Sequence, residues 1–439
     1  MSVDLAVVAA VDSYPGVEDR LLAGVRIRED LDAYLRTGGY TPIGDAEALL
    51  AAVEEVGLRG RGGAAFPLGR KIRAVRPARS DPAVGPARPV PVVVANGEEG
   101  EPASVKDRWL MRHRPHLILD GLRLASALTG TDERHAYVGD PESARSLERA
   151  AAELAGLGLG PTALRVTEVA PSYVAGEETA LVRAINGGPA LPSDKPPRPF
   201  ESGIAGRPTL VSNVETLAGL ALIQRLGAPA YRRFGPPGSA GTFLLSLTAV
   251  AGAGLFEVPF GVTLRQVLTW RGEDPAEVAG LLMGGYFAGV LGPHGLDLPL
   301  EPDALRAAGS GLGCGAVVVI PAGRCPVAVA AAVLSYFARE NAGQCGSCFN
   351  GTAAMSVVLR DLARHHARPA DLDRLRHWSA FLPGRGACGT LDGAAGVAAS
   401  LLREFPDLVT GHLDLTCPKC AGAPPPGDRP FALSPPSAG

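Results

Sequence analysis

Apolar positions in the first half of the chain alternate between short runs and stretches with helical spacing. Residues 90–95 are an apolar run too short for a helix, which indicates a buried strand. The elements expected after it are a helix over 116–127, a strand at 136–138, a helix over 141–154 and a strand over 164–169. Because strands that alternate with helices are typical of a parallel sheet covered on both faces, the pattern predicts an α/β domain.

The second half of the chain changes character. Short β-type runs at 242–248 and 254–258, with a helix at 264–270, indicate a small α+β module. After it, apolar positions recur at helical spacing, and four helices together suggest a four-helix bundle. The expected helices span residues 326–341, 352–363, 370–382 and 393–403.

We therefore divide the chain into five parts. They are an N-terminal extension (1–45), an α/β domain (46–238), an α+β module (239–315), a helical bundle (316–410) and a proline-rich tail (411–439). We expect residues 421–439 to be disordered, and the proline- and arginine-rich residues 76–89 to be irregular and exposed.

Composition narrows the class of protein. The chain has 439 residues, 46% of them hydrophobic, enough to bury the cores of about three domains of roughly 150 residues. A net charge of -3 gives no general attraction to nucleic acid or anionic lipid. With no export signal and no apolar run of about 18 residues, we expect a cytoplasmic protein without membrane insertion. Seven cysteines, an odd number, favour metal-binding or reduced thiols over disulfides.

One stretch is unusually rich in glycine. Residues 57–71 contain five glycines, three arginines and Lys71, a composition typical of a loop that brings backbone amides and cations to a phosphate or flavin. A flexible basic turn is the alternative, but Phe66 and Pro67 stiffen the loop. We favour a cofactor loop.

Carboxylates follow the first strand. Residues 96–102 read Asn-Gly-Glu-Glu-Gly-Glu-Pro, and Lys-Asp-Arg follows at 106–108. Open α/β sheets place ligands beyond the carboxyl ends of strands, although a solvated acidic turn explains the segment equally well.

Two later motifs have structural interpretations. Glu177 and Glu178 begin a helix, where the helix dipole stabilises their negative charges. Ser212 with Glu215 fits a capping box at the start of another helix.

The cysteines leave several arrangements open. Cys345 and Cys348 form a Cys-x-x-Cys at a helix start, where amides stabilise thiolates, and Cys388 can add a third ligand. Iron–sulfur cubanes usually take four thiolates. The Cys-x-x-Cys at 417–420 can combine with the first pair in a zinc site, and we interpret Cys314 and Cys325 as buried thiols.

Taken in order, these motifs resemble the NADH- and FMN-binding flavoprotein subunit of respiratory complex I and the related diaphorase subunits of NAD-linked hydrogenases and formate dehydrogenases. The similarity covers about residues 45–405. It implies a Rossmann-like flavin domain, a ubiquitin-like β-grasp module and a helical bundle with a [4Fe–4S] cluster.

The resemblance also implies site residues. Those around FMN are Gly60, Arg61, Gly62, Lys71, Asn96, Glu98, Glu99, Tyr173, Gly176, Glu177, Asn213 and Thr216. Those at the NADH site are Phe66, Glu101, Glu178 and Lys195. Metal ligands are Cys345, Cys348 and Cys388. No residue is named catalytic, because hydride transfer from nicotinamide to flavin needs no protein acid or base. Glu178 beside the adenosine ribose would repel the extra phosphate of NADPH.

The sequence departs from the family pattern at six positions. Ala342 replaces one cluster cysteine, so either another group such as Asn341, water or a distant cysteine completes the [4Fe–4S] cluster, or the cluster is lost. Ala74 and Arg198 stand where the family offers aromatic residues to adenine, and Arg198 also leaves NADPH as an alternative. The remaining departures, all near the flavin, are Ala65, Ala175 and Ser212.

These observations predict an NADH:acceptor oxidoreductase of the FMN-dependent diaphorase type. Its expected partners are an iron–sulfur or ferredoxin-like electron-transfer protein and other subunits of a redox complex, with no nucleic acid. We expect it in the cytoplasm, either free or at the periphery of a membrane complex. Two alternatives are a paralogue that serves only binding or assembly, and a zinc-binding structural protein.

Overall fold

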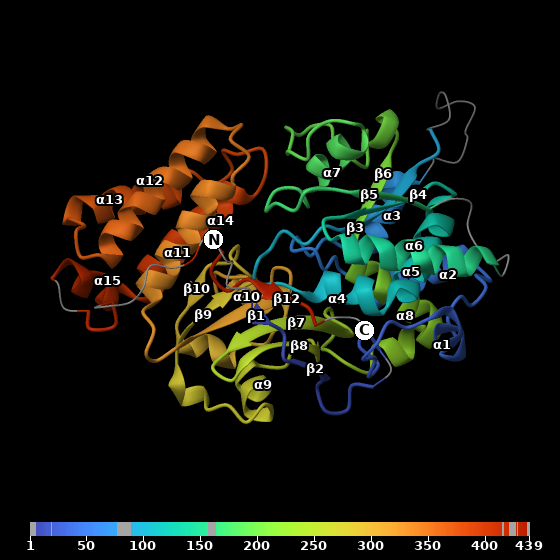
Figure 1. The fold of residues 1–439 in the computed structure, drawn as a ribbon, viewed down its shortest axis with the longest axis horizontal. Coiled ribbons are helices and arrows are strands. Elements are labelled where there is room, and N and C mark those ends of the chain that lie inside the picture. The colour runs from blue at the N-terminus through green and yellow to red at the C-terminus, as the bar shows by residue number, and fades with distance from the viewer. Residues whose placement is uncertain are drawn as a thin grey trace.

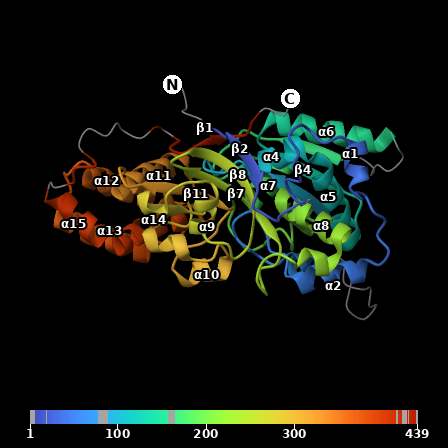
Figure 2. The ribbon, with the colours of Figure 1, turned by 90° about the horizontal axis from the view of Figure 1, so that it is seen from below.

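The chain forms three adjoining parts in the computed structural model (Figures 1 and 2). An α/β part lies at one end, a mixed sheet in the middle and a group of helices at the other end. The described residues are 6–18, 20–76, 89–156, 164–414, 417–420, 427 and 429–436.

A four-stranded parallel sheet organises the α/β part. Its strand order is β5-β4-β3-β6, and every neighbouring pair is parallel. The strands are β3 (Val92–Gly97), β4 (Arg134–Val138), β5 (Leu164–Glu168) and β6 (Thr209–Asn213). The predicted strands at 90–95, 136–138 and 164–169 are therefore confirmed. β6 was not expected, because its last residues read as part of a helix cap.

Helices cover this sheet and carry most of its core. They are α1 (Leu31–Arg36), α2 (Ala46–Val56), α3 (Leu68–Val75), α4 (Lys106–His113), α5 (Pro115–Thr129), α6 (Pro141–Gly156), α7 (Glu178–Ile185) and α8 (Val214–Tyr231). α5 and α8 pack so closely that a Cβ on Gly121 would lie 2.0 Å from the carbonyl oxygen of Leu217. Only glycine permits that approach.

A six-stranded mixed sheet forms the middle part, with strand order β10-β9-β11-β7-β8-β2. Its members are β2 (Ala10–Ser13), β7 (Thr242–Ala249), β8 (Gly252–Pro259), β9 (Val278–Met283), β10 (Val290–Leu291) and β11 (Ala316–Pro321). The helices of this part are α9 (Leu264–Trp270) and α10 (Pro302–Ala307). The expected strands at 242–248 and 254–258 and the helix at 264–270 are confirmed. The sheet also draws β2 and β11 from outside residues 239–315, and the domain boundaries stay a prediction.

The helical part follows β11 directly. It contains α11 (Pro326–Glu340), α12 (Gly346–Ala363), α13 (Pro369–Phe381), α14 (Thr390–Glu404) and α15 (Pro406–Leu413). The first four agree with the predicted helices to within six residues at each end, and α15 was not expected. Apolar side chains from α11, α12 and α14 share one buried cluster.

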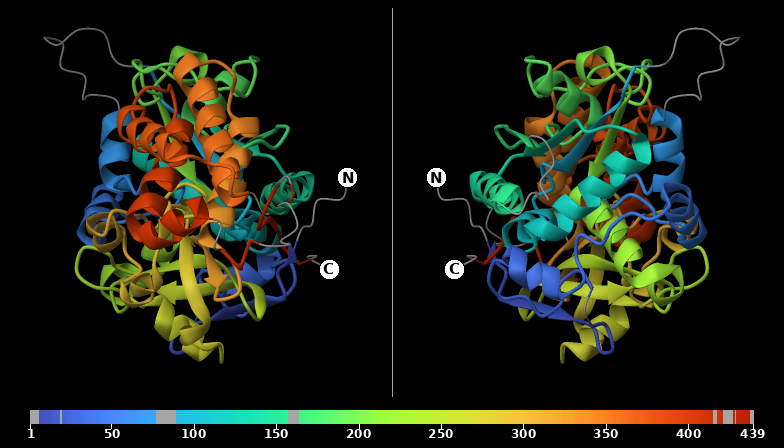
Figure 3. Two further views of the ribbon diagram at one scale, coloured as in Figure 1. Left: turned by 90° about the vertical axis from the view of Figure 1, so that its left-hand side faces the viewer. Right: turned by 90° about the vertical axis from the view of Figure 1, so that its right-hand side faces the viewer.

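The two ends of the described chain meet. β1 (Ala6–Val7) pairs in parallel with β12 (Leu433–Ser434), and Figure 3 shows the blue and red segments side by side. Disorder is therefore a wrong prediction for residues 429–436. Residues 421–426, 428 and 437–439 lie outside the described residues, as do 77–88 of the expected exposed connection. Within the described ranges, no helix combines the length and the apolarity that crossing a bilayer demands.

Candidate functional site

Two adjoining cavities open at the carboxyl ends of β3 and β6. The first has a volume of about 470 Å³ and the second about 360 Å³. Both are lined by Gly62, Asn96, Gly176, Glu177 and Asn213. The first cavity is also lined by Gly60, Phe66, Lys71, Glu178, Lys195 and Thr216, and the second by Glu98, Glu99, Glu101 and Tyr173. Segments far apart in the sequence thus bring every predicted FMN and NADH residue except Arg61 to these two cavities.

The glycine-rich loop is ordered. Its two arms are joined by hydrogen bonds from the Gly60 amide to the Phe66 carbonyl, 2.9 Å, and from the Leu68 amide to the Leu58 carbonyl, 2.8 Å. The Arg61 amide donates to the Thr216 hydroxyl of α8 at 2.9 Å. A flexible basic turn is therefore the wrong interpretation.

Arg61 points away from the two cavities. Its guanidinium lies 4.3 Å from the centre of the Phe260 ring and 3.9 Å from a carboxylate oxygen of Glu215. Together with Gly60 it lines a third cavity of about 330 Å³. The backbone of Arg61 thus belongs to the loop, while its side chain faces the mixed sheet.

Ion-paired side chains line part of the first cavity. The Lys71 Nζ donates to the Val211 carbonyl at 2.8 Å and lies 3.7 Å from Glu178. Lys195 pairs with Glu177 at 2.6 Å and with Glu178 at 3.4 Å. Burial lowers the pKa of Lys71. Burial also acts on Lys195, but its two carboxylates outweigh it and raise the pKa of that lysine.

Helix capping fixes two cavity residues. A Glu177 carboxylate oxygen accepts from the Thr179 and Ala180 amides at the start of α7, at 2.8 and 3.2 Å. At the start of α8, the cap is Asn213, whose Oδ1 accepts from the Glu215 amide at 3.0 Å. The predicted Ser212–Glu215 capping box is therefore wrong, because Glu215 turns inward instead.

The acidic stretch after β3 is buried. Glu98 Oε1 accepts from the Ser172 amide at 3.3 Å, while Oε2 has no hydrogen-bond partner among the described residues. Burial raises the pKa of Glu98 to about 8 and that of Glu101 to about 7. A solvated acidic turn is therefore excluded, and two protonated carboxyls can stand beside the cavities near neutral pH.

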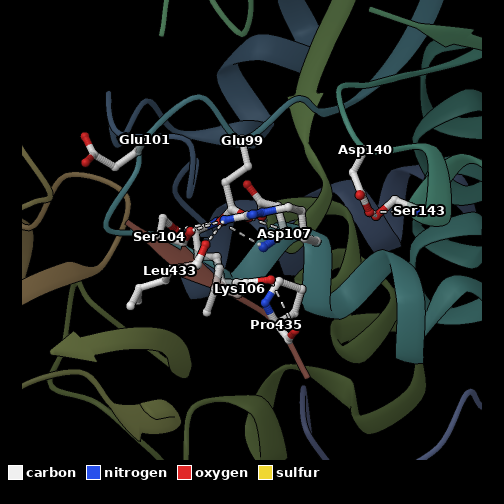
Figure 4. A network of polar contacts seen from close by, with 12 residues as sticks. Glu99, Glu101, Ser104, Lys106, Asp107, Asp140, Ser143, Leu433 and Pro435 are labelled. Atoms are coloured by element: carbon white, nitrogen blue, oxygen red, sulfur yellow. Dashed lines mark hydrogen bonds and ion pairs between the residues drawn. The ribbon is translucent and has the colours of Figure 1, made fainter. Parts of the chain in front are cut away.

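Buried ion pairs and hydrogen bonds connect this acidic stretch to the residues that follow it (Figure 4). Lys106 is fully buried and pairs with Asp107 at 2.7 Å and with Glu215 at 2.9 Å. Asp107 in turn accepts a hydrogen bond from the side-chain Nδ2 of Asn213 at 2.7 Å, and Glu99 pairs with Arg108 at 3.0 Å. The network connects the acidic stretch to the cap of α8. Residues 106–108 stood out in the sequence, but the roles of Lys106 and Glu215 were not predicted.

Four side chains at the outer end of the first cavity concern the predicted stacking on adenine. They are Phe66, which is half exposed, Ala74, Arg198 and Phe200. Phe200 was not predicted. Its position two residues after Arg198 is the sequence signal that was available.

The three predicted metal ligands meet at one small hollow. Cys345, Cys348 and Cys388 line it together with Ala342. Asn341 does not offer a free fourth ligand: its Nδ2 donates to carbonyls at the end of α11, and its Oδ1 accepts from the Gly343 amide at 3.0 Å. Three thiols therefore gather at one hollow, and Ala342 supplies no fourth donor to it.

The other cysteines have different neighbours from those predicted. Cys417 and Cys420 do not gather with the first Cys-x-x-Cys; their sulfurs lie close to Cys325 and His412. Cys325 is a buried free thiol, as predicted, and its sulfur also belongs to this group of possible metal ligands. Cys314 lines the second and third cavities.

Comparisons with known proteins agree with this arrangement. Residues 53–221 match the Nuo51 FMN-binding domain, and residues 328–412 match the NADH-ubiquinone oxidoreductase-F iron-sulfur binding region. The NADH-quinone oxidoreductase F subunit 2 of Rhizobium meliloti is 33% identical over 392 residues, which is 86% of this chain and 90% of that protein. The corresponding F subunit of Escherichia coli is 32% identical over 407 residues, 87% of this chain and 90% of that protein. The chain belongs to the family of NADH-quinone oxidoreductase F subunits.

A solved structure extends this family likeness to three dimensions. A chain of the NAD+-reducing [NiFe]-hydrogenase in the H2-reduced state superposes with a TM-score of 0.78 and 30% identity, covering 93% of this chain and 68% of that chain. The FMN-binding match contains the glycine-rich loop and the acidic stretch, and the iron-sulfur match contains Cys345, Cys348 and Cys388. The family resemblance drawn from the motifs is thus confirmed.

Proposed function

We propose that this chain oxidises NADH with FMN as its resident cofactor and delivers the electrons to an iron–sulfur partner. The observation that carries the proposal is the convergence of fifteen predicted residues, from loops separated by up to about 150 positions, on two adjoining cavities. When bound, FMN accepts a hydride from nicotinamide and releases the electrons one at a time. The protein supplies binding, orientation and a suitable electrostatic environment.

The residues present fit a flavin mononucleotide. Gly60 and Gly62 offer a backbone without Cβ atoms, and Lys71 offers a cation on the wall of the same cavity. Glu98 lines the second cavity, and its buried Oε2, which has no partner among the described residues, could bond a polar edge of a bound ring system. We assign the FMN to these side chains together with Asn96, Glu99, Tyr173, Gly176, Glu177, Asn213 and Thr216.

NADH would enter from the outer end of the first cavity. Phe66 presents an exposed aromatic face for adenine, and Arg198 and Phe200 line the same end. We assign Glu178 and Lys195, which line this cavity, to the ribose and phosphates, where Glu178 would disfavour a 2′-phosphate. Glu101 lines the second cavity, and we assign it to the same dinucleotide.

The exit for electrons runs toward the helical part. Cys388 lines both the second cavity and the hollow that it shares with Cys345 and Cys348, so the three thiols stand directly beyond the flavin site. We propose that they hold an iron–sulfur cluster whose fourth iron lacks a protein thiolate.

The family resemblance suggests finer assignments. We propose that the parallel sheet is Rossmann-like, that the mixed sheet corresponds to a β-grasp module and that α11–α14 form a four-helix bundle. The two relatives and the hydrogenase chain belong to enzymes whose names imply redox partners. By analogy, we assign the mixed sheet and the helical part as docking surfaces for another protein of a redox complex, in the cytoplasm or at the periphery of a membrane complex.

A cavity-filling variant tests the proposed function. Purified without oxygen and reconstituted with FMN, the chain should catalyse ferricyanide reduction by NADH. Gly62→Val places a branched side chain on a residue that lines both cavities, and it should weaken FMN binding at least about ten-fold. Gly44→Val is the matched control, because a Cβ there meets nothing within 4 Å. Equal FMN binding by both variants would disprove the location of the site.

A further inference from the structure

A second group of metal-ligating side chains lies outside the flavin and cluster sites. Cys325 caps the start of α11, His412 lies in the last turn of α15, and Cys417 and Cys420 follow α15. In Figure 1, α15 lies at the end of the helical part that is remote from the α/β part. All four ligand atoms lie within 4.8 Å of one another. We propose that these residues bind one structural zinc ion.

The distances suit a single tetrahedral ion. The Cys417 sulfur lies 3.9 Å from that of Cys325 and 3.8 Å from that of Cys420. The His412 Nε2 lies 3.5 Å from the Cys325 sulfur and 3.1 Å from the Cys420 sulfur. Zinc–sulfur bonds of about 2.3 Å and a zinc–nitrogen bond of about 2.0 Å separate tetrahedral ligands by about 3.8 Å for two sulfurs and about 3.5 Å for sulfur and nitrogen.

The histidine is oriented as a ligand. Its Nδ1 lies 2.7 Å from the Leu408 carbonyl oxygen, which can only accept, so Nδ1 carries the proton and the Nε2 lone pair faces the sulfurs. The His365 ring stacks on the His412 ring with centroids 4.9 Å apart, and its Nδ1 contacts the His412 carbonyl at 3.0 Å. Metal-binding histidines are commonly held by such outer contacts.

The surroundings favour a structural ion. Cys325, His412 and Cys417 are buried, and Cys420 is partly buried. Four protein ligands leave no open position, which is the arrangement of structural zinc sites. Such an ion would fix the segment after α15 to the start of α11.

The compactness of the group distinguishes it from a cubane. In a [4Fe–4S] cluster each thiolate binds a different iron, so the sulfurs stand farther apart than around one ion. Among the described residues, the group of Cys325, His412, Cys417 and Cys420 is the only set of three or more potential ligands this close together. Cys345, Cys348 and Cys388 do not form such a set.

Metal analysis of the full chain tests the proposal. Purified without oxygen, the chain should carry about one zinc, and Cys420→Ser and His412→Ala should each lose zinc at least about ten-fold while keeping FMN. Cys345→Ser is the matched control: it should lower iron and leave zinc unchanged. Cobalt(II) added to the metal-free parent should give the visible bands of a tetrahedral thiolate site.

The outcomes separate this site from the others. Absence of zinc from the parent, together with no cobalt(II) spectrum, would overturn the proposal even if the substituted chains fail to fold. Loss of iron instead of zinc in Cys420→Ser would also overturn it, in favour of an iron–sulfur centre. FMN content is measured in the same samples, so failure of the zinc proposal leaves the flavin assignment intact.

Discussion

At the scale of single residues, Glu98 connects burial to cofactor binding. Its raised pKa means that the folded chain binds a proton that the unfolded chain releases at lower pH, so its contribution to stability declines as pH rises from about 4.5 to about 8.

The protonated carboxyl of Glu98 can also donate a hydrogen bond from Oε2 to a bound flavin. We expect FMN affinity to fall about ten-fold per pH unit above pH 8 in the parent, and to stay level in Glu98→Gln, whose amide donates at every pH. Equal slopes in FMN titrations of both proteins would contradict this role.

Arg198 allows a second test at this scale. An aromatic ring at this position should stack on adenine, and base stacking contributes about 1–3 kcal/mol. Arg198→Phe should therefore bind NADH about ten-fold more tightly. NADPH binding, measured alongside, should not improve, because the substitution removes a cation that can pair with a 2′-phosphate. Unchanged or weaker NADH binding would show that the arginine plane already stacks.

The sequence predicted the cavity residues better than it predicted their orientations. Motif order brought Lys71, Glu177 and Asn213 to the same site, because each stands in a short motif of glycines, carboxylates or a helix cap. The direction of Arg61 depends on Phe260 and Glu215, which come close only through the fold. Phe200 was missed even though it stands two residues after Arg198 in the sequence.

At the scale of elements, Ala342 follows α11 and lines the cysteine hollow without offering a metal ligand. Ala342→Cys adds a thiol to the wall that already carries Cys345, Cys348 and Cys388. We expect chemically reconstituted Ala342→Cys to hold about four irons per chain more stably than the parent under chelator. Ala342→Ser, of nearly equal size and without a thiolate, is the control. Equal iron retention in all three proteins would mean that this position is not a ligand position.

The buried ion pairs of Lys106, one within α4 and one to α8, provide a stability prediction. Lys106→Met leaves Asp107 and Glu215 buried without their cation, which should cost about 3–5 kcal/mol of unfolding free energy. Arg265→Met removes the exposed pair with Asp297 and should leave the unfolding free energy almost unchanged, because solvent screens that pair. Urea unfolding of the two variants measures both. A cost for Lys106→Met no larger than that for Arg265→Met would contradict the supporting role of this network.

Element prediction succeeded where hydrophobic periodicity was local. The apolar spacing of α11 and the short apolar run of β3 need no distant partner to be recognised. β12 pairs with β1 from the opposite end of the chain, and α15 is only eight residues long, so neither has a strong local signal.

At the scale of the whole molecule, the three parts meet around the cofactor site. The second cavity is lined by Asn96 of the α/β part, Gly313 of the middle part and Cys388 of the helical part. Such a junction was not predicted, because no local sequence pattern shows which parts of the fold meet. Under our proposal the flavin lies between the NADH entrance and the cysteine hollow.

Anaerobic titration of the FMN-loaded chain with NADH, followed by flavin absorbance, is the decisive test of NADH oxidation at this site. We expect one NADH per bound flavin to bleach the absorbance, and Gly62→Val, which should bind FMN at least about ten-fold more weakly, to show a smaller change at the same FMN concentration. Bound FMN that NADH leaves oxidised, or a chain that takes up no FMN under any condition, would contradict it.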